Sequence, residues 1–536
     1  MHSAQHQQSS GISRRQFLRA LGIGTAALGT SLVLPGQAQE RFVLSEDTFG
    51  RMFPRLPSFF EHVSGRQLPE LQRVMKEIGK LGGMMDAKDD LSAGPIRLIT
   101  DPGLNLINRN NPAHTAGTTF MGQFLDHDMT FDLTSKLGVP TDPEDSVNTR
   151  TPALDLDSVY GGGPSASPEL YELRRGPAPK FKIESGGRFE DVPRDRKQQA
   201  IIADPRNDEN LIISGLQAAF LLFHNHAVDY VADRDKRASS DNVFREARRL
   251  TSWHYQWMIV HEFLPLFIGQ ELVKDILDKG RKIYQPREAF IPVEFQGAVY
   301  RFGHTLVRPS YRANLKGDKG ELPFFAMIFD DAGEGQDDPI DLRGGARAPR
   351  RFVGWQTFFD FGLLENDGIS PAVKPNKRID TKISTPLFKL PVGAIAGGVS
   401  QGEPVSLPSR NLLRHITWSL PSGQSIARVL GVPVLSKEQL KDLKQFDFGL
   451  DESTPLWFYA LREGDLMADG AHLGPVGGRI VGEVFIGLLQ LDQRSYLAAR
   501  PPWKPTLPDR NGKVTGNFTM LDFLTFAGVA PAQRGQ

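Results

Sequence analysis

The sequence predicts a mainly α protein, built as one large helical domain with long irregular loops and little β-structure. Several long segments place apolar residues at helical spacing, whereas strict alternation of apolar and polar residues is scarce. Pro- and Gly-rich stretches separate these segments. The chain has 536 residues, of which 40% are hydrophobic, and it contains neither internal repeats nor a low-complexity linker. A single large core is therefore the simplest expectation.

The predicted helices follow in chain order. An amphipathic helix at residues 59–80 ends at Gly82 and Gly83, and a second helix at 118–133 follows a loop rich in Asn and Pro. Residues 137–205 are expected to be mostly irregular, and a loop of this length usually carries a site. Further helices are predicted at 210–234, 240–276, 301–312, 409–430, 437–444, 455–467 and 476–491, with a kink or break at Pro265.

Residues 1–38 are predicted to be an export signal of the Tat type, which leaves residues 39–536 as the domain. Arg14 and Arg15 precede an uncharged run from Ala20 to Leu34, and small residues at 36–38 suit cleavage. This run is too short for a stable membrane span, although an uncleaved anchor is the alternative. We expect export by the Tat machinery, a periplasmic or secreted protein, and no stable membrane span after cleavage.

Composition excludes several classes of function. Lys and Arg number 63, as do Asp and Glu, so no overall positive charge favours nucleic acid as a partner. Cysteine is absent, which rules out disulfides, thiolate ligands to haem, iron–sulfur clusters and zinc ribbons.

The segment at residues 119–132, TFMGQFLDHDMTFD, is the most unusual in the chain. His127 shares an otherwise aromatic helical stripe, Gln123 lies one turn before it, and Asp126 and Asp128 flank it. Taken alone, this pattern fits either a buried histidine bonded to a neighbour or a catalytic imidazole between two carboxylates.

Three other short segments combine with this one. Asp204 can cap a helix that begins at Pro205, which places Arg206 and Glu209 on one face. His304 lies in the sequence VYRFGHTLVRP, and Asn411 and Arg414 are one helical turn apart. Each of these features alone would fit an ordinary structural role.

Together these segments resemble the animal-type haem peroxidases of the peroxidase–cyclooxygenase superfamily, which includes myeloperoxidase and lactoperoxidase, and especially their bacterial members. The resemblance extends from about residue 53 to residue 529. The family's GQ-x-x-DHD element matches residues 122–128 and its R-x-x-E element matches residues 206–209. Its R-[YF]-GHT element matches residues 301–305, and its asparagine–arginine pair matches Asn411 and Arg414.

The resemblance implies a haem b cofactor with His304 as the axial ligand of the iron. Asn411 would accept a hydrogen bond from the other ring nitrogen of His304. On the open side, His127 would move the proton of hydrogen peroxide, and Arg206 would stabilise the charge that develops as the O–O bond breaks. A ferryl intermediate would then oxidise a halide, a pseudohalide or a small organic donor.

Other family residues are also present. Carboxylates that match Asp126 and Glu209 form esters with haem methyl groups in the family, so we expect covalent haem; two unlinked carboxylates are the alternative. Gln123 matches a residue that helps to hold a halide, and Arg301 is suited to a haem propionate. Arg414 is assigned to haem binding with these. Myeloperoxidase has a methionine directly after the glutamate, but Asn210 stands there in this chain, so a sulfonium link is excluded.

A Ca²⁺ site is predicted beside Asp128. In residues 151–157, TPALDLD, oxygen donors occur at alternate positions, which an extended segment presents on one side. The expected ligands are Asp128, Thr151, the Ala153 carbonyl, Asp155 and Asp157. The family's calcium loop aligns here, and it usually has serine at the position of Asp157.

Two alternatives to a peroxidase remain. Fatty-acid dioxygenases and cyclooxygenases of the same superfamily carry a radical-forming tyrosine three residues before the axial histidine. That position is Arg301 here, which favours the peroxidase. A non-catalytic exported binding scaffold is the second alternative, and the presence of His127, Arg206 and His304 argues against it.

Overall fold

The computed structural model describes residues 47–534, except 174–175, 186–188, 318–321, 337, 363–372 and 396–397. The predicted export signal at residues 1–38 lies outside the described residues. The α-helices are α2 (Leu68–Ile78), α3 (Gly94–Thr100), α4 (Gly117–Met129), α5 (Asp157–Tyr160), α6 (Gly163–Ala166), α7 (Leu211–Arg234), α8 (Ser240–Met258), α9 (Leu264–Ile268), α10 (Gln270–Lys279), α11 (Val293–Gln296), α12 (Gly303–Leu306), α13 (Leu407–Thr417), α14 (Gly423–Leu430), α15 (Leu456–Ala468), α16 (Pro475–Leu491), α17 (Met520–Phe526) and α18 (Pro531–Arg534).

The strands are short and form only two-stranded antiparallel sheets among the described residues. They are β1 (Asp47–Thr48), β2 (Asn110–Thr115), β3 (Val147–Asn148), β4 (Tyr171–Glu172), β5 (Lys180–Phe181), β6 (Glu184–Ser185), β7 (Glu190–Asp191), β8 (Ser310–Arg312), β9 (Phe325–Met327) and β10 (Pro375–Lys377). The pairs are β1–β3, β2–β10, β4–β5, β6–β7 and β8–β9. The predicted mainly α fold is confirmed.

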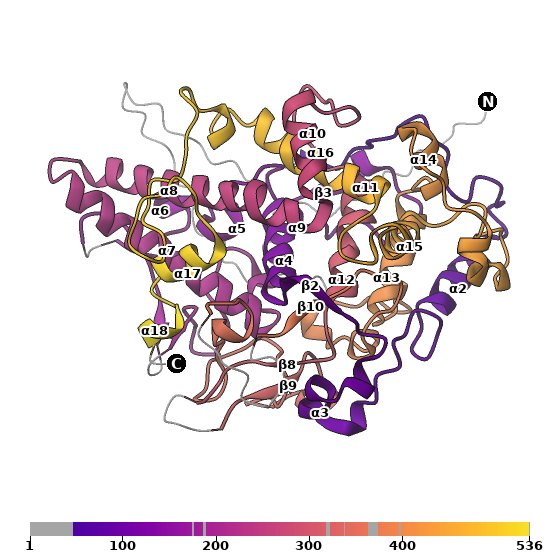
Figure 1. Cartoon of the computed structure of the whole chain (residues 1–536), viewed down its shortest axis with the longest axis horizontal. Helices are drawn as coiled ribbons and strands as arrows, with labels where there is room; N and C mark the ends of the chain where they lie inside the picture. Colours follow the sequence, from indigo (N-terminus) through magenta and orange to yellow (C-terminus); the bar gives the residue numbers. More distant parts are fainter. Residues whose placement is uncertain are drawn as a thin grey trace, which may run out of the picture.

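Two long helices, α7 and α8, pack side by side at one end of the molecule (Figure 1). By length and composition alone, α7 could span a membrane, whereas the sequence analysis predicts no stable membrane span after cleavage of the signal. However, 83% of its apolar window is buried inside the protein, which is typical of a core helix.

The helix predicted at 240–276 does not break at Pro265. α8 continues through a π-helical turn, Ile259–Phe263, into α9, where Pro265 lies in the first turn and its missing N–H is tolerated. The helix ends instead at Gly269, whose φ of 82° is a conformation that glycine adopts without strain. α10 begins directly after this glycine.

Other helices are shorter than predicted. α2 begins at Leu68 rather than at residue 59. The segment predicted at 301–312 contains the end of a 3₁₀ turn, η7 (Val299–Phe302), then α12 and strand β8. The segment predicted at 437–444 is the 3₁₀ helix η12 (Glu438–Gln445). Within residues 137–205 the regular elements are short, as expected for an irregular stretch.

α4 lies near the centre of the molecule and packs against α7 and α12 (Figure 1). It ends at Met129 rather than at residue 133, because Thr130 is extended (φ −137°, ψ 136°). The backbone N–H of Phe131 then donates to the side chain of Asn148 at 2.8 Å. Phe131 therefore leaves the helical stripe that it was predicted to share with His127, although it still faces the same cavity.

Candidate functional site

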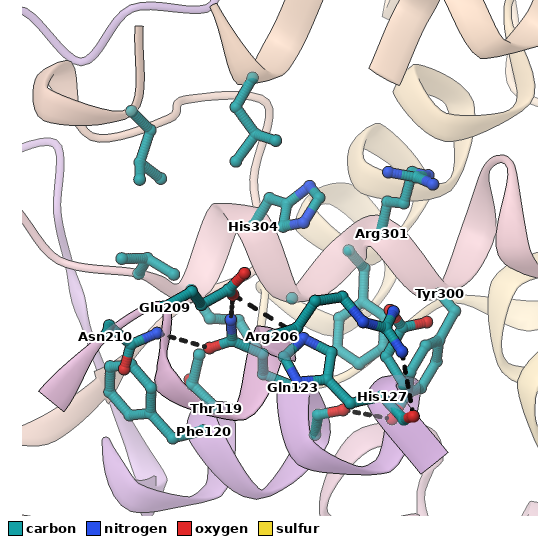
Figure 2. A pocket seen from close by; sticks show the side chains of 18 of the residues that line it. Thr119, Phe120, Gln123, His127, Arg206, Glu209, Asn210, Tyr300, Arg301 and His304 are labelled. Carbon is teal, nitrogen blue, oxygen red and sulfur yellow. Dashed lines mark hydrogen bonds and ion pairs between the residues drawn. The ribbon is translucent and has the colours of Figure 1, made fainter. Parts of the chain in front are cut away.

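A cavity of about 260 Å³ lies between α4, the 3₁₀ turn η5 (Pro205–Asp208), α12 and α13. Figure 2 shows His304 on one side, and Gln123, His127, Arg206 and Glu209 together on the other. The predicted residues that line it are Gln123, Asp126, His127, Arg206, Glu209, Arg301, His304 and Arg414. Four segments that are far apart in the sequence therefore meet at one cavity.

His127 is buried, with 4% of its surface exposed, and an asparagine fixes its orientation. Its Nδ1 lies 2.8 Å from Oδ1 of Asn207, whose amide nitrogen donates to Oε1 of Gln217 at 2.8 Å. Because Oδ1 can only accept, Nδ1 carries the ring proton and Nε2 keeps its lone pair. Burial, and then the positive charge of Arg206, lower the pKa of His127 to about 3. The imidazole is therefore neutral and able to accept a proton at Nε2.

Arg206 is held at the cavity by a carboxylate and a carbonyl. Its Nε and Nη2 donate to the two oxygens of Asp204 at 3.0 and 2.7 Å, and Nη2 also donates to the carbonyl of His127 at 3.0 Å. Asp204 additionally accepts from Nε of Arg150 at 2.9 Å. Although burial alone would raise the pKa of Asp204, Arg150 and Arg206 lower it well below its usual range. The guanidinium of Arg206 is thus fixed in place by a permanently charged partner.

Gln123 and Glu209 form a polar group next to His127 (Figure 2). The amide nitrogen of Gln123 donates to Oε1 of Glu209, and Nε2 of His127 lies 3.7 Å from the same oxygen. Burial raises the pKa of Glu209 to about 8. This carboxyl is therefore mostly protonated at neutral pH.

Asp126 lines the same cavity one residue before His127. Its Oδ1 accepts a hydrogen bond from Thr130 at 3.0 Å, and burial raises its pKa. Among the described residues, it forms no ion pair within 4 Å. Asp126 and Glu209 are thus two partly buried carboxyls that face the cavity without a direct cationic partner among the described residues.

His304 on α12 also bonds to an asparagine, with its Nδ1 2.7 Å from the amide nitrogen of Asn411. Asn411 donates in this arrangement, whereas the acceptor role expected for it concerns a His304 ring that is bound to iron. The amide nitrogen of Asn411 faces His304 because its Oδ1 accepts a hydrogen bond from Nη1 of Arg301 at 3.3 Å. Burial, followed by the charge of Arg301, lowers the pKa of His304 to about 3, so this ring is also neutral.

Three arginines line one end of the cavity. Arg301 donates through Nε to the carbonyl of Gln296 at 2.8 Å, and burial lowers its pKa to about 10, so it stays charged at neutral pH. Arg414 donates to Asp132 at 2.6 Å. Arg410, which the sequence reading missed, lies in the same lining.

The predicted calcium ligands meet on another side of α4. Carboxylate oxygens of Asp128, Asp155 and Asp157 lie within 4.8 Å of one another, and all three residues are buried. Thr151 donates to Asp155 at 3.1 Å, and Ala153 lies between them in the same loop. One oxygen of Asp155 and one of Asp157 are buried without a hydrogen bond. This donor set consists of hard oxygens, as Ca²⁺ requires.

The charges in this acidic cluster are poorly compensated. Burial, and then the carboxylates of Asp157 and Asp155, raise the pKa of Asp128 well above its usual range. Burial also raises the pKa of Asp157 to about 7, although Arg150 lies 3.6 Å away and opposes this effect. A divalent cation would supply the missing positive charge.

The sequence reading missed Asn207 and Asp132 as well as Arg410. Asn207 stands inside the R-x-x-E element at a position that the pattern leaves free, so only its contact with His127 reveals it. Asn411 lies behind His304 rather than in the cavity lining. The predicted calcium ligands do not line the cavity either, although Asp128 directly follows His127.

Parts of the chain are similar in sequence to known proteins. A model of the animal haem peroxidase family matches residues 132–341. The peroxidasin homologue pxn-2 of Caenorhabditis elegans is 24% identical over 382 residues, which cover 66% of this chain and 27% of that protein. The chain spans between 15% and 27% of the length of the first curated relatives that it matches.

Two solved structures share the fold. Peroxidase A from Dictyostelium discoideum is 18% identical, with a TM-score of 0.50, over 75% of this chain and 84% of that chain. The fatty acid α-dioxygenase of Oryza sativa is 14% identical, with a TM-score of 0.53, over 80% of this chain and 74% of that chain. At this level of sequence identity, both similarities support the fold alone.

Proposed function

Because the chain belongs to the animal haem peroxidase family, we propose that it is a haem peroxidase that reduces hydrogen peroxide and oxidises halide, pseudohalide or small organic donors. The observation that carries this proposal is the pair of neutral imidazoles at one cavity. His127 and His304 each engage an asparagine through Nδ1, and in His127 this contact leaves Nε2 with its lone pair. The guanidinium of Arg206 lies beside His127.

The residues of the cavity fit a haem. Asp126 and Glu209 are partly buried carboxyls without a direct cationic partner among the described residues. Arg301, Arg410 and Arg414 offer positive charge for propionates at one end. Apolar side chains suited to a porphyrin face complete the lining: Leu306, Val307, Ile328, Phe329, Leu387 and Leu390. His304 would hold the iron, which when bound supplies the redox chemistry between peroxide and donor.

His127 would act as the general base and acid. Its neutral Nε2 takes a proton from hydrogen peroxide and returns it to the departing oxygen as the O–O bond breaks. Arg206 stabilises the negative charge that develops on that oxygen, and its bidentate bond to Asp204 keeps it in place without reorganisation. Asn207 keeps the ring proton on Nδ1, so that Nε2 always presents its lone pair.

On the other side, iron binding at Nε2 of His304 requires the ring proton on Nδ1. Asn411 must then present Oδ1 rather than its amide nitrogen, which the side chain achieves by turning its amide over. Arg301, which holds Oδ1 in the present arrangement, would pair with a haem propionate instead. The expected acceptor role of Asn411 is thus assigned to the haem-loaded protein.

Asp126 and Glu209 would form ester bonds to haem methyl groups, each methyl carbon losing a hydrogen and two electrons, with hydrogen peroxide as the oxidant that is reduced to water. Both carboxyls face the cavity, and burial raises the pKa of each, so neither is held as a salt-bridged carboxylate.

Ca²⁺ would bind Asp128, Asp155 and Asp157 with oxygens of Thr151 and Ala153. Arg14 and Arg15, with the uncharged run from Ala20 to Leu34, support Tat export to the periplasm or the medium.

The test is a spectrum and an assay of the purified protein loaded with haem. A high-spin ferric Soret band, with peroxide-dependent oxidation of guaiacol or bromide, is the expected result. Oxygen uptake with linoleate in the absence of peroxidase turnover would instead identify a dioxygenase. A protein that takes up no haem would overturn the proposal in favour of a binding scaffold.

A further inference from the structure

Asn210 links the start of α7 to the polar side of the cavity (Figure 2). As the N-cap of α7, its Oδ1 accepts a hydrogen bond from the backbone N–H of Ile213 at 3.0 Å. Its Nδ2 donates to Oε1 of Gln123 at 3.3 Å. Asn210 itself is buried, with 3% of its surface exposed.

These two contacts fix the direction of both amides. A backbone N–H can only donate, so the atom of Asn210 that faces Ile213 must be the oxygen. The atom that faces Gln123 is consequently Nδ2, a donor, and it must meet the oxygen of the Gln123 amide. The nitrogen of Gln123 then points away from Asn210, toward Glu209 and the cavity.

The Gln123 amide carries two N–H groups, and Glu209 uses one of them. The second is available to a ligand in the cavity. An amide with the reverse orientation would present carbonyl lone pairs to that ligand, which would repel an anion. The direction of this single amide therefore decides whether the cavity favours anions at this point.

We propose that Asn210 is a positioning residue that locks the N–H groups of Gln123 toward the cavity and thereby makes it bind small anions such as bromide. This inference rests on the proposed peroxidase function and specifies how the site selects its donor. The N-cap of α7 fixes the orientation of the Asn210 amide, because the backbone N–H of Ile213 can only donate.

The test compares N210D and N210S with wild type, all loaded with haem. Aspartate caps a helix as well as asparagine does, but both of its oxygens only accept, so it draws the Gln123 nitrogen to itself and turns the oxygen to the cavity. Serine keeps the cap but is too short to direct Gln123. Bromide binding is titrated through the Soret band, and KM for bromide is compared with kcat for guaiacol.

We expect N210D to weaken bromide binding by about tenfold or more, because the N–H of Gln123 that would bond the anion is replaced by the carbonyl oxygen, which repels it. The bromide affinity of N210S should lie between those of N210D and wild type. The added charge of aspartate is controlled by a double-mutant cycle with Q123L. If the effect passes through Gln123, N210D should change bromide binding little in the Q123L background.

Wild-type bromide affinity in N210D would overturn the inference, and so would an equal loss in N210D with and without Q123L, which indicates charge repulsion alone. Should N210D fail to take up haem, N210S decides: bromide binding like that of wild type overturns the lock. A wild-type protein without haem uptake or guaiacol oxidation would instead refute the proposed function itself.

Discussion

Removing divalent cations should make the protein progressively less stable as the pH rises, because the acidic cluster of Asp128, Asp155 and Asp157 is then uncompensated. Burial raises the folded-state pKa of both Asp128 and Asp157 above the value of an unfolded aspartate. The folded protein therefore binds more protons than the unfolded chain, so the free energy of unfolding falls with increasing pH. For Asp157 the window runs from its ordinary value of 3.8 to about 7.

The size of the effect follows from the pKa shift of Asp157. A rise from 3.8 to about 7 corresponds to a loss on the order of 4 kcal/mol once the pH exceeds the upper value. A chain of 536 residues unfolds with an entropy of roughly 1 kcal/mol per kelvin, so the loss lowers Tm by about 4 °C.

Scanning calorimetry at about pH 5 and about pH 8, in EDTA and in excess Ca²⁺, measures this difference. The gain in Tm from Ca²⁺ should be larger at the higher pH, and Mg²⁺ should replace it poorly because it demands a tighter octahedron. As a matched variant, D157S keeps an oxygen but removes a charge. It should raise Tm in EDTA more at the higher pH, and it should respond less to Ca²⁺. A Ca²⁺ effect of equal size at both pH values would refute the reasoning.

Four further outcomes are expected. H127A should lower kcat/KM for hydrogen peroxide by roughly two to four orders of magnitude with unchanged haem content, since it removes the general base; a small change would contradict that role. H304A should lose the high-spin Soret band and haem retention, and a normal spectrum would place the iron elsewhere. N207A should slow peroxide reduction by about tenfold or more because the tautomer of His127 is no longer fixed, whereas N207D, which still accepts from Nδ1, should retain more activity. Haem staining after denaturing electrophoresis should weaken in D126N or E209Q and vanish in the double variant; stain that is absent already in wild type would exclude the esters.

The sequence sufficed for features that depend on local spacing. Helical periodicity and capping predicted α7 to within one residue of its start, and Asp204 caps η5 as expected. The four short motifs supplied every predicted residue of the cavity lining. These features can be predicted from the sequence because residues close together along the chain determine them.

Contacts between distant segments were not predictable in this way. α4 ends at Met129, and the side chain of Asn148 then accepts the backbone N–H of Phe131, a contact that no residue pattern within the helix predicts. Asn207 was missed because its partner His127 is 80 residues away in the sequence. The direction of the Asn411 amide in this arrangement depends on Arg301, a residue 110 positions away in the sequence.

Asp204 stands between two arginines, and each of them serves a different site. Arg150 also lies 3.6 Å from Asp157 at the edge of the acidic cluster, while Arg206 faces the cavity between His127 and His304. A divalent cation bound by the cluster would take over the charge of Asp157 and leave Arg150 to pair with Asp204 alone. Filling the proposed cation site would thus strengthen the support of the Arg206 guanidinium without any direct contact to it.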